Sequence, residues 1–522
     1  MALAALVAAP LVLALYVLRI DEVVGSYVDD GWYVLLGKAL ATGHGFTLLN
    51  TPTPGIRPLY PPGFPLVLSA VFRLFPTFPD NVPVLKAVSV AAMTGAGILA
   101  WTHSRRIRGL PSVLAFGVAL ATVLHPAFVF LATATVLSEC VFTCVQLAAI
   151  VATERGLRRR DAEAWPLFAG GLLAGFAMLV RGFGIAAIVA GVVLLVRQRR
   201  WRGLAWFLAG TLLVLAPWQV DAWRHPTTPA QQLEANDYVV FGYGTHFWKR
   251  WAGQAQYGDE TWADLPGRVW RCARRLFRID GGALLLYPAY RQVEPGVMPF
   301  AIAPWAYPVS MVLVTLMGLG WVIEMRRRTG VAELVVAGTL VLALVWPWVP
   351  FRFFLPLLPF LLCYLLSALH TTGRLVRATP GVPVLAAVLA VQIAVSAWAD
   401  VAYVRAVRGP LESRPAWNRG FAEQRELVRW IAEHTPPDEV VAASMPGFVH
   451  LFSGRRTVGR WNGDRSMATW RDLGVRYLAL LDFSAQPVPD NISPQLVAYR
   501  TSPTNLRVLD VGKLMGTDPR RP

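Results

Sequence analysis

Two adjacent carboxylates, Asp29 and Asp30, follow the first apolar run of the chain. They open a stretch in which apolar residues recur at helical spacing, which predicts a helix that begins at the acidic pair. A carboxylate there can act as a general base, provided that it lies within hydrogen-bond reach of an acceptor proton. It can also cap the helix by accepting backbone N–H groups. Capping needs only one carboxylate, so the pair leaves both roles open.

A second set of candidates is cationic. Arg57, Arg181 and Arg352 are expected on the same side of a membrane as the acidic pair, and a guanidinium suits a phosphate through its permanent charge and forked donors. Interfacial arginines also snorkel to lipid headgroups, most plainly for Arg57. Glu139 lies in an apolar stretch, where it either pairs with Arg181 or contacts substrate.

Metal ligation has no clear sequence signal. The histidines expected on the same side lack ligand-like spacing, so a divalent metal is left open and no cofactor is assigned (His44, His225, His246 and His450). Aromatic residues in segment 224–300 suit either sugar stacking or interfacial anchoring (Tyr238, Tyr243, Trp248 and Trp251).

These residues must be positioned by membrane helices. Of 522 residues, 55% are hydrophobic and only 16% are charged, which indicates a membrane protein. Apolar runs predict eleven spans, near 2–18, 82–102, 110–124, 136–152, 165–180, 185–196, 204–223, 301–323, 331–348, 353–370 and 382–399. The helix after Asp30, with Lys38 off its apolar stripe, and the run 64–75 are expected to lie along the membrane surface.

Charge sets the predicted orientation. Clustered arginines fill alternate short connections, among them Arg105, Arg106, Arg108, Arg155, Arg158, Arg159, Arg160, Arg197, Arg199, Arg200, Arg202, Arg326, Arg327, Arg328, Arg374 and Arg377. By the positive-inside rule these connections are cytoplasmic, which places 21–81, 224–300 and the residues after about 400 outside. The net charge of +17 is thereby explained by topology, and nucleic-acid binding has no separate support.

The chain divides into a membrane domain at 1–400 and a small α/β domain at 401–522. In the second part, the amphipathic stretch 418–439 precedes β-like runs at 440–443, 475–481 and 506–511.

The order of motifs resembles the GT-C superfamily, which includes protein O-mannosyltransferases and lipid A aminoarabinose transferases. Asp29, Asp30 and Tyr33 match an Asp-acidic-x-x-Tyr pattern, and LLGKALATGHGF and PPGFPL follow it. The resemblance continues in SE at 138–139, LVRGFG at 179–184, RFFLPLLP at 352–359, WIAEHTPPDEVV at 430–441 and SGRRTV at 453–458.

That resemblance implies a multi-pass enzyme of the bacterial inner membrane that moves a sugar from a polyprenyl-phosphate carrier, with inversion, to a glycan, lipid or protein acceptor outside. It implies Asp29 as the base, Asp30 as a residue that orients the acceptor or holds a metal, and Tyr33, Tyr60, Arg57, Glu139, Arg181 and Arg352 as substrate-binding residues. An O-antigen polymerase or ligase, which also uses lipid-linked sugars, and a polytopic transporter are the alternatives.

Overall fold

A computed structural model describes residues 2–27, 29–158, 164–235, 238–251, 257–292, 299–301, 303–375, 379–459, 464–481 and 496–512. Arg159, Arg160 and Arg377, on which the predicted orientation partly rests, lie outside the described residues. The chain forms two compact units, one from Met1–Ile20, Lys86–Asp221 and His246–Val404, and the other from Asp21–Leu85, Ala222–Thr245 and Arg405–Pro522. We call them the helical unit and the mixed unit.

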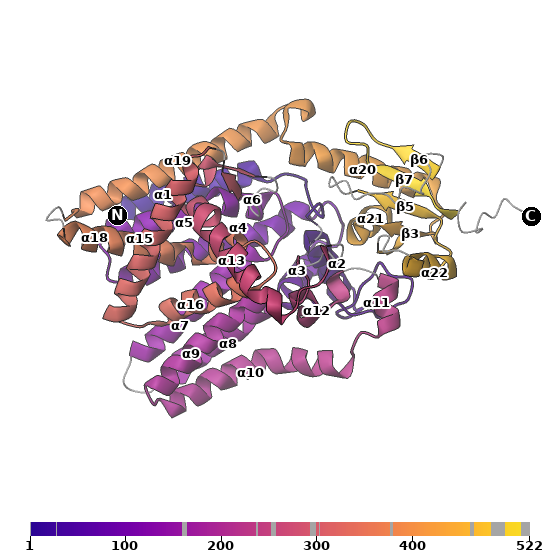
Figure 1. The fold of residues 1–522 in the computed structure, drawn as a ribbon. Coiled ribbons are helices and arrows are strands. Elements are labelled where there is room, and N and C mark those ends of the chain that lie inside the picture. Colours follow the sequence, from indigo (N-terminus) through magenta and orange to yellow (C-terminus); the bar gives the residue numbers. More distant parts are fainter. Residues whose placement is uncertain are drawn as a thin grey trace, which may run out of the picture. The chain divides into compact units, whose positions relative to one another are not determined.

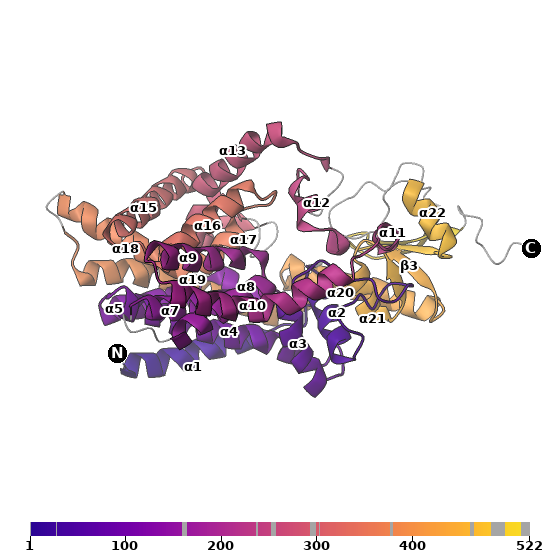
Figure 2. The ribbon, with the colours of Figure 1, turned by 90° about the horizontal axis from the view of Figure 1, so that it is seen from below.

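The helical unit is built mainly from apolar helices, together with the polar α13 and two short helices, α14 and α17. They are α1 (Ala2–Arg19), most of α4 (Val82–Thr102), α5 (Ser112–Val123), α6 (Pro126–Thr133), α7 (Glu139–Arg158), α8 (Ala164–Val180), α9 (Ile185–Arg197), most of α10 (Trp201–Arg224), α13 (Leu265–Arg275), α14 (Gly281–Leu286), α15 (Ala306–Arg327), α16 (Val331–Val345), α17 (Phe351–Phe354), α18 (Leu358–Leu375) and most of α19 (Val382–Arg408). Helices α7 and α8 pack along each other, as do α15 and α18 (Figures 1 and 2). A short hairpin pairs β1 (Tyr290–Gln292) with β2 (Pro299–Ala301).

Each predicted span coincides with a helix. Among the described residues, six helices are long and apolar enough to cross a membrane, and α5 with α6, bent by 47°, would form a seventh. The other four predicted spans correspond to the shorter apolar helices at Leu6–Arg19, Ala164–Val180, Gly182–Arg197 and Val331–Val345. A helix shorter than about 20 residues spans the hydrocarbon layer only where neighbours shield its ends. The predicted all-α membrane fold with a small α/β part is confirmed.

The bend between α5 and α6 was not predicted. His125 is extended because the ring of Pro126 excludes helical geometry at the preceding residue, and Pro126 then starts α6. The predicted span at 110–124 therefore continues past the bend to Thr133, and α7 begins only at Glu139.

The mixed unit holds a five-stranded sheet in the order β4-β3-β5-β7-β6, shown in yellow in Figure 1. Its strands are β3 (Val440–Ala443), β4 (Arg456–Val458), β5 (Tyr477–Leu480), β6 (Val497–Arg500) and β7 (Arg507–Asp510). The three predicted strands are present as β3, β5 and β7. Strand β3 runs parallel to β4 and β5, and β7 runs antiparallel to β5 and β6.

Both faces of this sheet are covered. Helices α20 (Ala416–His434) and α21 (Pro446–Ser453) bury Phe421, Ile431 and Phe448 against one face. Trp470 of α22 (Asp464–Asp472) belongs to a second core that includes Leu478 and Leu509. Strands buried on both faces carry unbroken apolar runs, which is why β3 could be located from the sequence.

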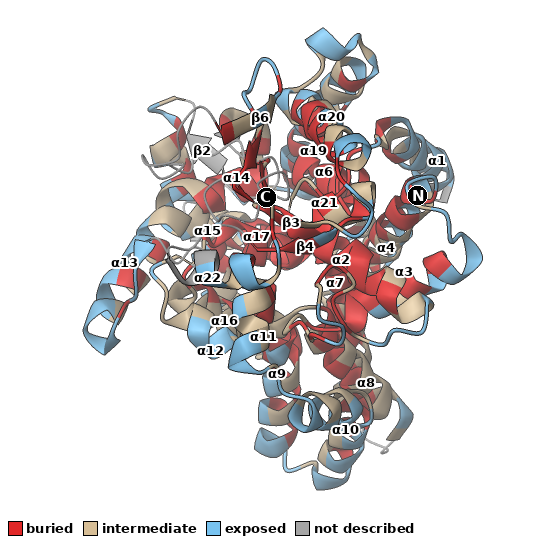
Figure 3. Ribbon diagram, turned by 90° about the vertical axis from the view of Figure 1, so that its right-hand side faces the viewer, coloured by how far each residue is buried: buried red, intermediate tan, exposed pale blue. Residues whose placement is uncertain are grey.

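The helix that carries the acidic pair is α2 (Asp29–Ala41), followed by α3 (Gly63–Leu74). Helix α2 has no exposed polar face over residues 30–37, which are all buried (Figure 3), and its expected place along the membrane surface stays a prediction. Helix α3 packs on one side, where Leu68 lies against Gly37, and α21 packs on another, where Gly447 lies against the ring of Trp32.

The mixed unit thus gathers Asp21–Leu85, Ala222–Thr245 and Arg405–Pro522 into one compact body. A domain of its own at 401–522 stays a prediction.

Candidate active site

The Asp29 carboxylate accepts hydrogen bonds from two tyrosines in the mixed unit. The Tyr60 hydroxyl lies 2.5 Å from Asp29 Oδ1, and the Tyr238 hydroxyl donates to the same oxygen. The two hydroxyls are 2.8 Å apart. A carboxylate offers about four acceptor positions, more than these hydroxyls use. We call Asp29, Tyr60 and Tyr238 the Asp29 cluster.

Aromatic packing fixes the Asp29 cluster. The Tyr33 ring stacks on the Tyr60 ring with 5.2 Å between centroids, and Phe64 meets Tyr33 edge to face. Burial raises the pKa of the Tyr60 phenol well above its usual range, and the negative charge of Asp29 adds to this shift. Tyr60 therefore stays protonated at neutral pH and remains a hydrogen-bond donor to Asp29.

One backbone hydrogen bond and one side-chain hydrogen bond join the segments that carry the two tyrosines, which are 178 residues apart in the chain. The Leu59 amide donates to the Val239 carbonyl at 2.8 Å, which joins the segment before α3 to the short helix Tyr238–Val240. Nearby, the Thr227 hydroxyl donates to the Arg57 carbonyl at 2.9 Å. Arg57 itself is half-buried in the same unit.

Asp30 serves the backbone. Its Oδ2 accepts the Gly25 amide at 2.8 Å, and its Oδ1 accepts the amides of Tyr27 at 2.9 Å and Gly31 at 3.0 Å. The residue is fully buried. Three backbone amides on one carboxylate make a tight turn ahead of α2, and this turn fixes where Asp29 stands.

The same turn depends on a glycine. Gly25 has a φ of +83°, a conformation that side chains disfavour, and an added Cβ would lie 2.8 Å from the Phe448 ring. Phe448 belongs to α21, so the C-terminal residues of the mixed unit support the turn that positions the Asp29 cluster.

A separate cluster in the helical unit joins Glu139, the first residue of α7, to two arginines. Arg181 Nη1 lies 2.9 Å from Glu139 Oε1, and Arg352 Nε donates to the same oxygen. Arg181 also donates to the Ser138 hydroxyl at 3.0 Å. Phe183 and Phe353, which follow the two arginines closely in the sequence, stack with 4.1 Å between their ring centroids. We call these residues the Glu139 cluster.

In the Glu139 cluster two arginines contact one carboxylate. Glu139 is fully buried and Arg352 is 7% exposed, whereas the Arg181 side chain is 15% exposed. Charge in such surroundings is costly unless it is paired, and the shared carboxylate supplies that pairing. The predicted pairing of Glu139 with Arg181 is present, and Arg352 joins it.

The sequence-predicted residues thus fall into two sets. Asp29, Tyr33, Tyr60 and Arg57 belong to the mixed unit, and Glu139, Arg181 and Arg352 belong to the helical unit. Tyr238 was predicted only as one aromatic in segment 224–300, and no sequence signal marked it as a partner of Asp29. Among the described residues, no group of three His, Cys, Asp or Glu side chains is placed to hold a metal ion.

Residues 60–223 fit the family model described as dolichyl-phosphate-mannose-protein mannosyltransferase. No curated protein sequence matches the chain.

Solved structures match over most of the chain. A crystal structure of ArnT from Cupriavidus metallidurans bound to undecaprenyl phosphate has a TM-score of 0.56 at 14% identity and covers 96% of both chains. The apo form of the same protein gives a TM-score of 0.51. The apo oligosaccharyltransferase of Archaeoglobus fulgidus gives 0.51 at 13% identity, over 86% of this chain and 65% of its own.

These proteins are GT-C glycosyltransferases, and the chain has their fold. The predicted resemblance to this superfamily is confirmed. The helices and these structural neighbours together describe a multi-pass membrane protein.

Proposed function

We propose that this chain, with its GT-C fold, transfers a sugar from a polyprenyl-phosphate carrier to an acceptor at the outer face of the inner membrane. The observation that carries the proposal is the Asp29 carboxylate, held at the start of α2 by two tyrosine hydroxyls. A general base must be fixed within reach of the proton that it removes, and such a rigid setting provides that.

The proposed reaction is a single displacement with inversion. The acceptor hydroxyl attacks the anomeric carbon while Asp29 takes its proton. The new oxygen–carbon bond forms as the bond from the anomeric carbon to the carrier phosphate breaks, and the electron pair leaves with the phosphate. Atoms and charge balance without an oxidant, a reductant or a metal.

The departing phosphate gains negative charge, which fixed cations stabilise. We assign this role to Arg181 and Arg352, because the Glu139 cluster holds two guanidinium groups against a single carboxylate. Arg57 is a further candidate for the donor phosphate. Glu139 sets the geometry of the two arginines, whose forked donors match phosphate oxygens.

Asp30 acts as a positioning residue, because both of its oxygens already bind backbone amides. The buried Tyr33 ring supports the half-buried Tyr60 ring beside Asp29, and Tyr60 suits the apolar face of a sugar ring. The acceptor is a glycan, a lipid or a protein. The carrier proposal is supported by the undecaprenyl phosphate bound to the ArnT structure.

The test is turnover of a panel of radiolabelled polyprenyl-phosphate hexoses and pentoses by protein in lipid nanodiscs, with a cell-envelope extract as acceptor. Wild type should consume one donor, Asp29→Asn should not, and Asp80→Asn, an exposed carboxylate of the same unit, should match wild type. No turnover of any donor by wild type would reject the transferase. Equal turnover by Asp29→Asn would reject the assigned base.

A further inference from the structure

A cavity of about 380 Å³ opens where α9 and α15 end, on the predicted cytoplasmic side of the helical unit. Four arginines line it: Arg197, Arg326, Arg327 and Arg328. Among its described lining residues there is no carboxylate. The proposed transfer reaction makes no use of this cavity.

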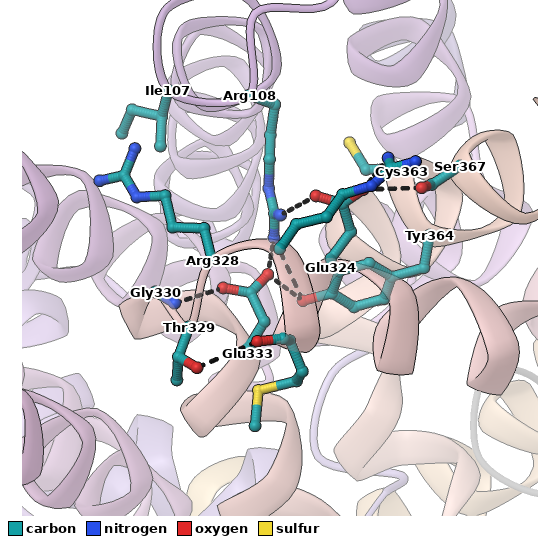
Figure 4. Close-up of polar contacts among 12 residues, drawn as sticks. Ile107, Arg108, Glu324, Arg328, Thr329, Gly330, Glu333, Cys363, Tyr364 and Ser367 are labelled. Carbon is teal, nitrogen blue, oxygen red and sulfur yellow. Dashed lines mark hydrogen bonds and ion pairs between the residues drawn. The ribbon is translucent and has the colours of Figure 1, made fainter. Parts of the chain in front are cut away.

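Two of the four arginines are held by carboxylates behind the lining. Arg327 Nη1 lies 3.2 Å from Glu324 Oε1, and Arg328 Nη2 lies 3.5 Å from Glu154 Oε2. From Glu324 the contacts continue to Arg108, which lies 3.2 Å from Glu324 and also contacts Glu333 (Figure 4). Both of these carboxylates bind side chains of α18 as well, Glu333 through Tyr364 and Glu324 through Ser367.

The cavity carries more positive than negative charge. Arg108, Arg327 and Arg328 face three glutamates, so that network is neutral. Within the described part of the chain, Arg197 and Arg326 make no hydrogen bond or ion pair, and both are exposed. Each helix C-terminus contributes about half a negative charge, or about one in total for α9 and α15. Two unpaired guanidinium groups outweigh that charge, and the cavity stays positive.

The remaining wall suits an amphiphile. Gln198 and Thr329 add polar groups to the lining, whereas Leu194 and Met325 add apolar surface. Closer to the middle of each helix, α9 exposes Val193 and α15 exposes Val322, and α15 is long and apolar enough to cross a membrane. A ligand with an anionic head and an apolar tail would meet both kinds of surface.

We propose that this cavity binds a phosphate-bearing anion, with the phosphate of an anionic phospholipid headgroup as its occupant. Forked guanidinium donors match phosphate oxygens, and basic pockets between membrane helices recognise such headgroups. The site is separate from the Glu139 cluster. Glu139 opens α7 and Glu154, which holds Arg328, lies 15 residues later on the same helix, so about 22 Å of helix separates them.

The experiment uses the full chain, delipidated in detergent, and titrates phosphatidylglycerol against native mass spectrometry and thermal unfolding. The double variant Arg197→Gln/Arg326→Gln removes the unpaired cations. Arg202→Gln/Arg374→Gln is the matched control, because both residues are exposed on the same predicted side and do not line the cavity. Phosphatidylcholine and inorganic phosphate are titrated in parallel.

We expect the affinity for phosphatidylglycerol to fall about 30-fold in the cavity variant, from the usual contribution of a basic residue near anionic lipid, and less than threefold in the control. Binding of phosphatidylglycerol together with competition by inorganic phosphate supports the lipid headgroup. Binding of inorganic phosphate alone supports the site and assigns it to a soluble anion. Equal losses in both variants, or no preference for phosphatidylglycerol over phosphatidylcholine, would overturn the proposal.

Discussion

Replacing Asp30 by Asn separates support from catalysis within the acidic pair. The Asn side chain places an amide nitrogen where one carboxylate oxygen stood, and that nitrogen cannot accept a hydrogen bond. The smaller loss occurs when the amide nitrogen of Asn takes the place of Oδ2, because then only the buried Gly25 amide loses its partner. The amides of Tyr27 and Gly31 then donate to a neutral oxygen.

The magnitude follows from these three bonds. An unsatisfied buried donor costs about 1–3 kcal/mol, and each of the other two bonds weakens by about 1 kcal/mol when its acceptor loses charge. The turn before α2 should therefore lose about 3–5 kcal/mol. Amide exchange in residues 29–41 should accelerate by at least about 100-fold if it proceeds through local opening of this turn.

Hydrogen exchange measured by mass spectrometry on peptides from α2 gives this number directly. Asp29→Asn is the control, because it keeps an oxygen for the tyrosine hydroxyls and should change exchange less than about tenfold. The reasoning fails if Asp30→Asn leaves exchange in α2 unchanged and still abolishes transfer. In that case Asp30 would act on the substrate itself.

Further predictions concern the other groups. Arg352→Gln should weaken binding of polyprenyl phosphate about 10- to 100-fold, as expected when one strong charge-assisted contact is lost. Arg352→Lys should not restore the affinity, because an ammonium lacks the forked donors of a guanidinium. Titration of the lipid checks both variants, and unchanged affinity would contradict the role. Tyr60→Phe with Tyr238→Phe should lower kcat about tenfold or more at a similar KM, measured with the active donor, whereas a change in KM alone would point to a binding role. Asp280 is buried, and its Oδ1 lies 3.3 Å from Arg275 Nε. Burial raises the pKa of Asp280 to about 6. The stability that its protonated form contributes is therefore lost as pH rises from about 4 to 6. Asp280→Asn should therefore remove a stability difference of about 2 kcal/mol between pH 4.5 and 7.5, measured by unfolding at both values, and the same pH dependence in wild type and variant would refute the assignment.

The apolar segments were predictable because their signal is local. The span at Val82–Thr102 and the strand at Val440–Ala443 have the bounds that their apolar runs predict. Helix α6 was not predicted, because the bend at His125 and Pro126 interrupts an apolar run that looks continuous in the sequence.

The surroundings of Asp29 were not predictable in the same way. The acidic pair marked the place, but which carboxylate caps the turn depends on the direction of each side chain. Tyr238 reaches Asp29 across 209 positions, and α2 is buried by Gly447 and its neighbours more than 400 positions away. Contacts over such separations have no periodicity that a sequence pattern can reveal.

The most direct test of the account is a single-turnover measurement of sugar transfer, with enzyme in excess over labelled donor and with saturating acceptor. Under these conditions the rate reports the chemical step rather than product release. The account predicts that Asp29→Asn slows this step by about 100-fold or more while donor binding stays within threefold of wild type. An unchanged single-turnover rate in Asp29→Asn would contradict it.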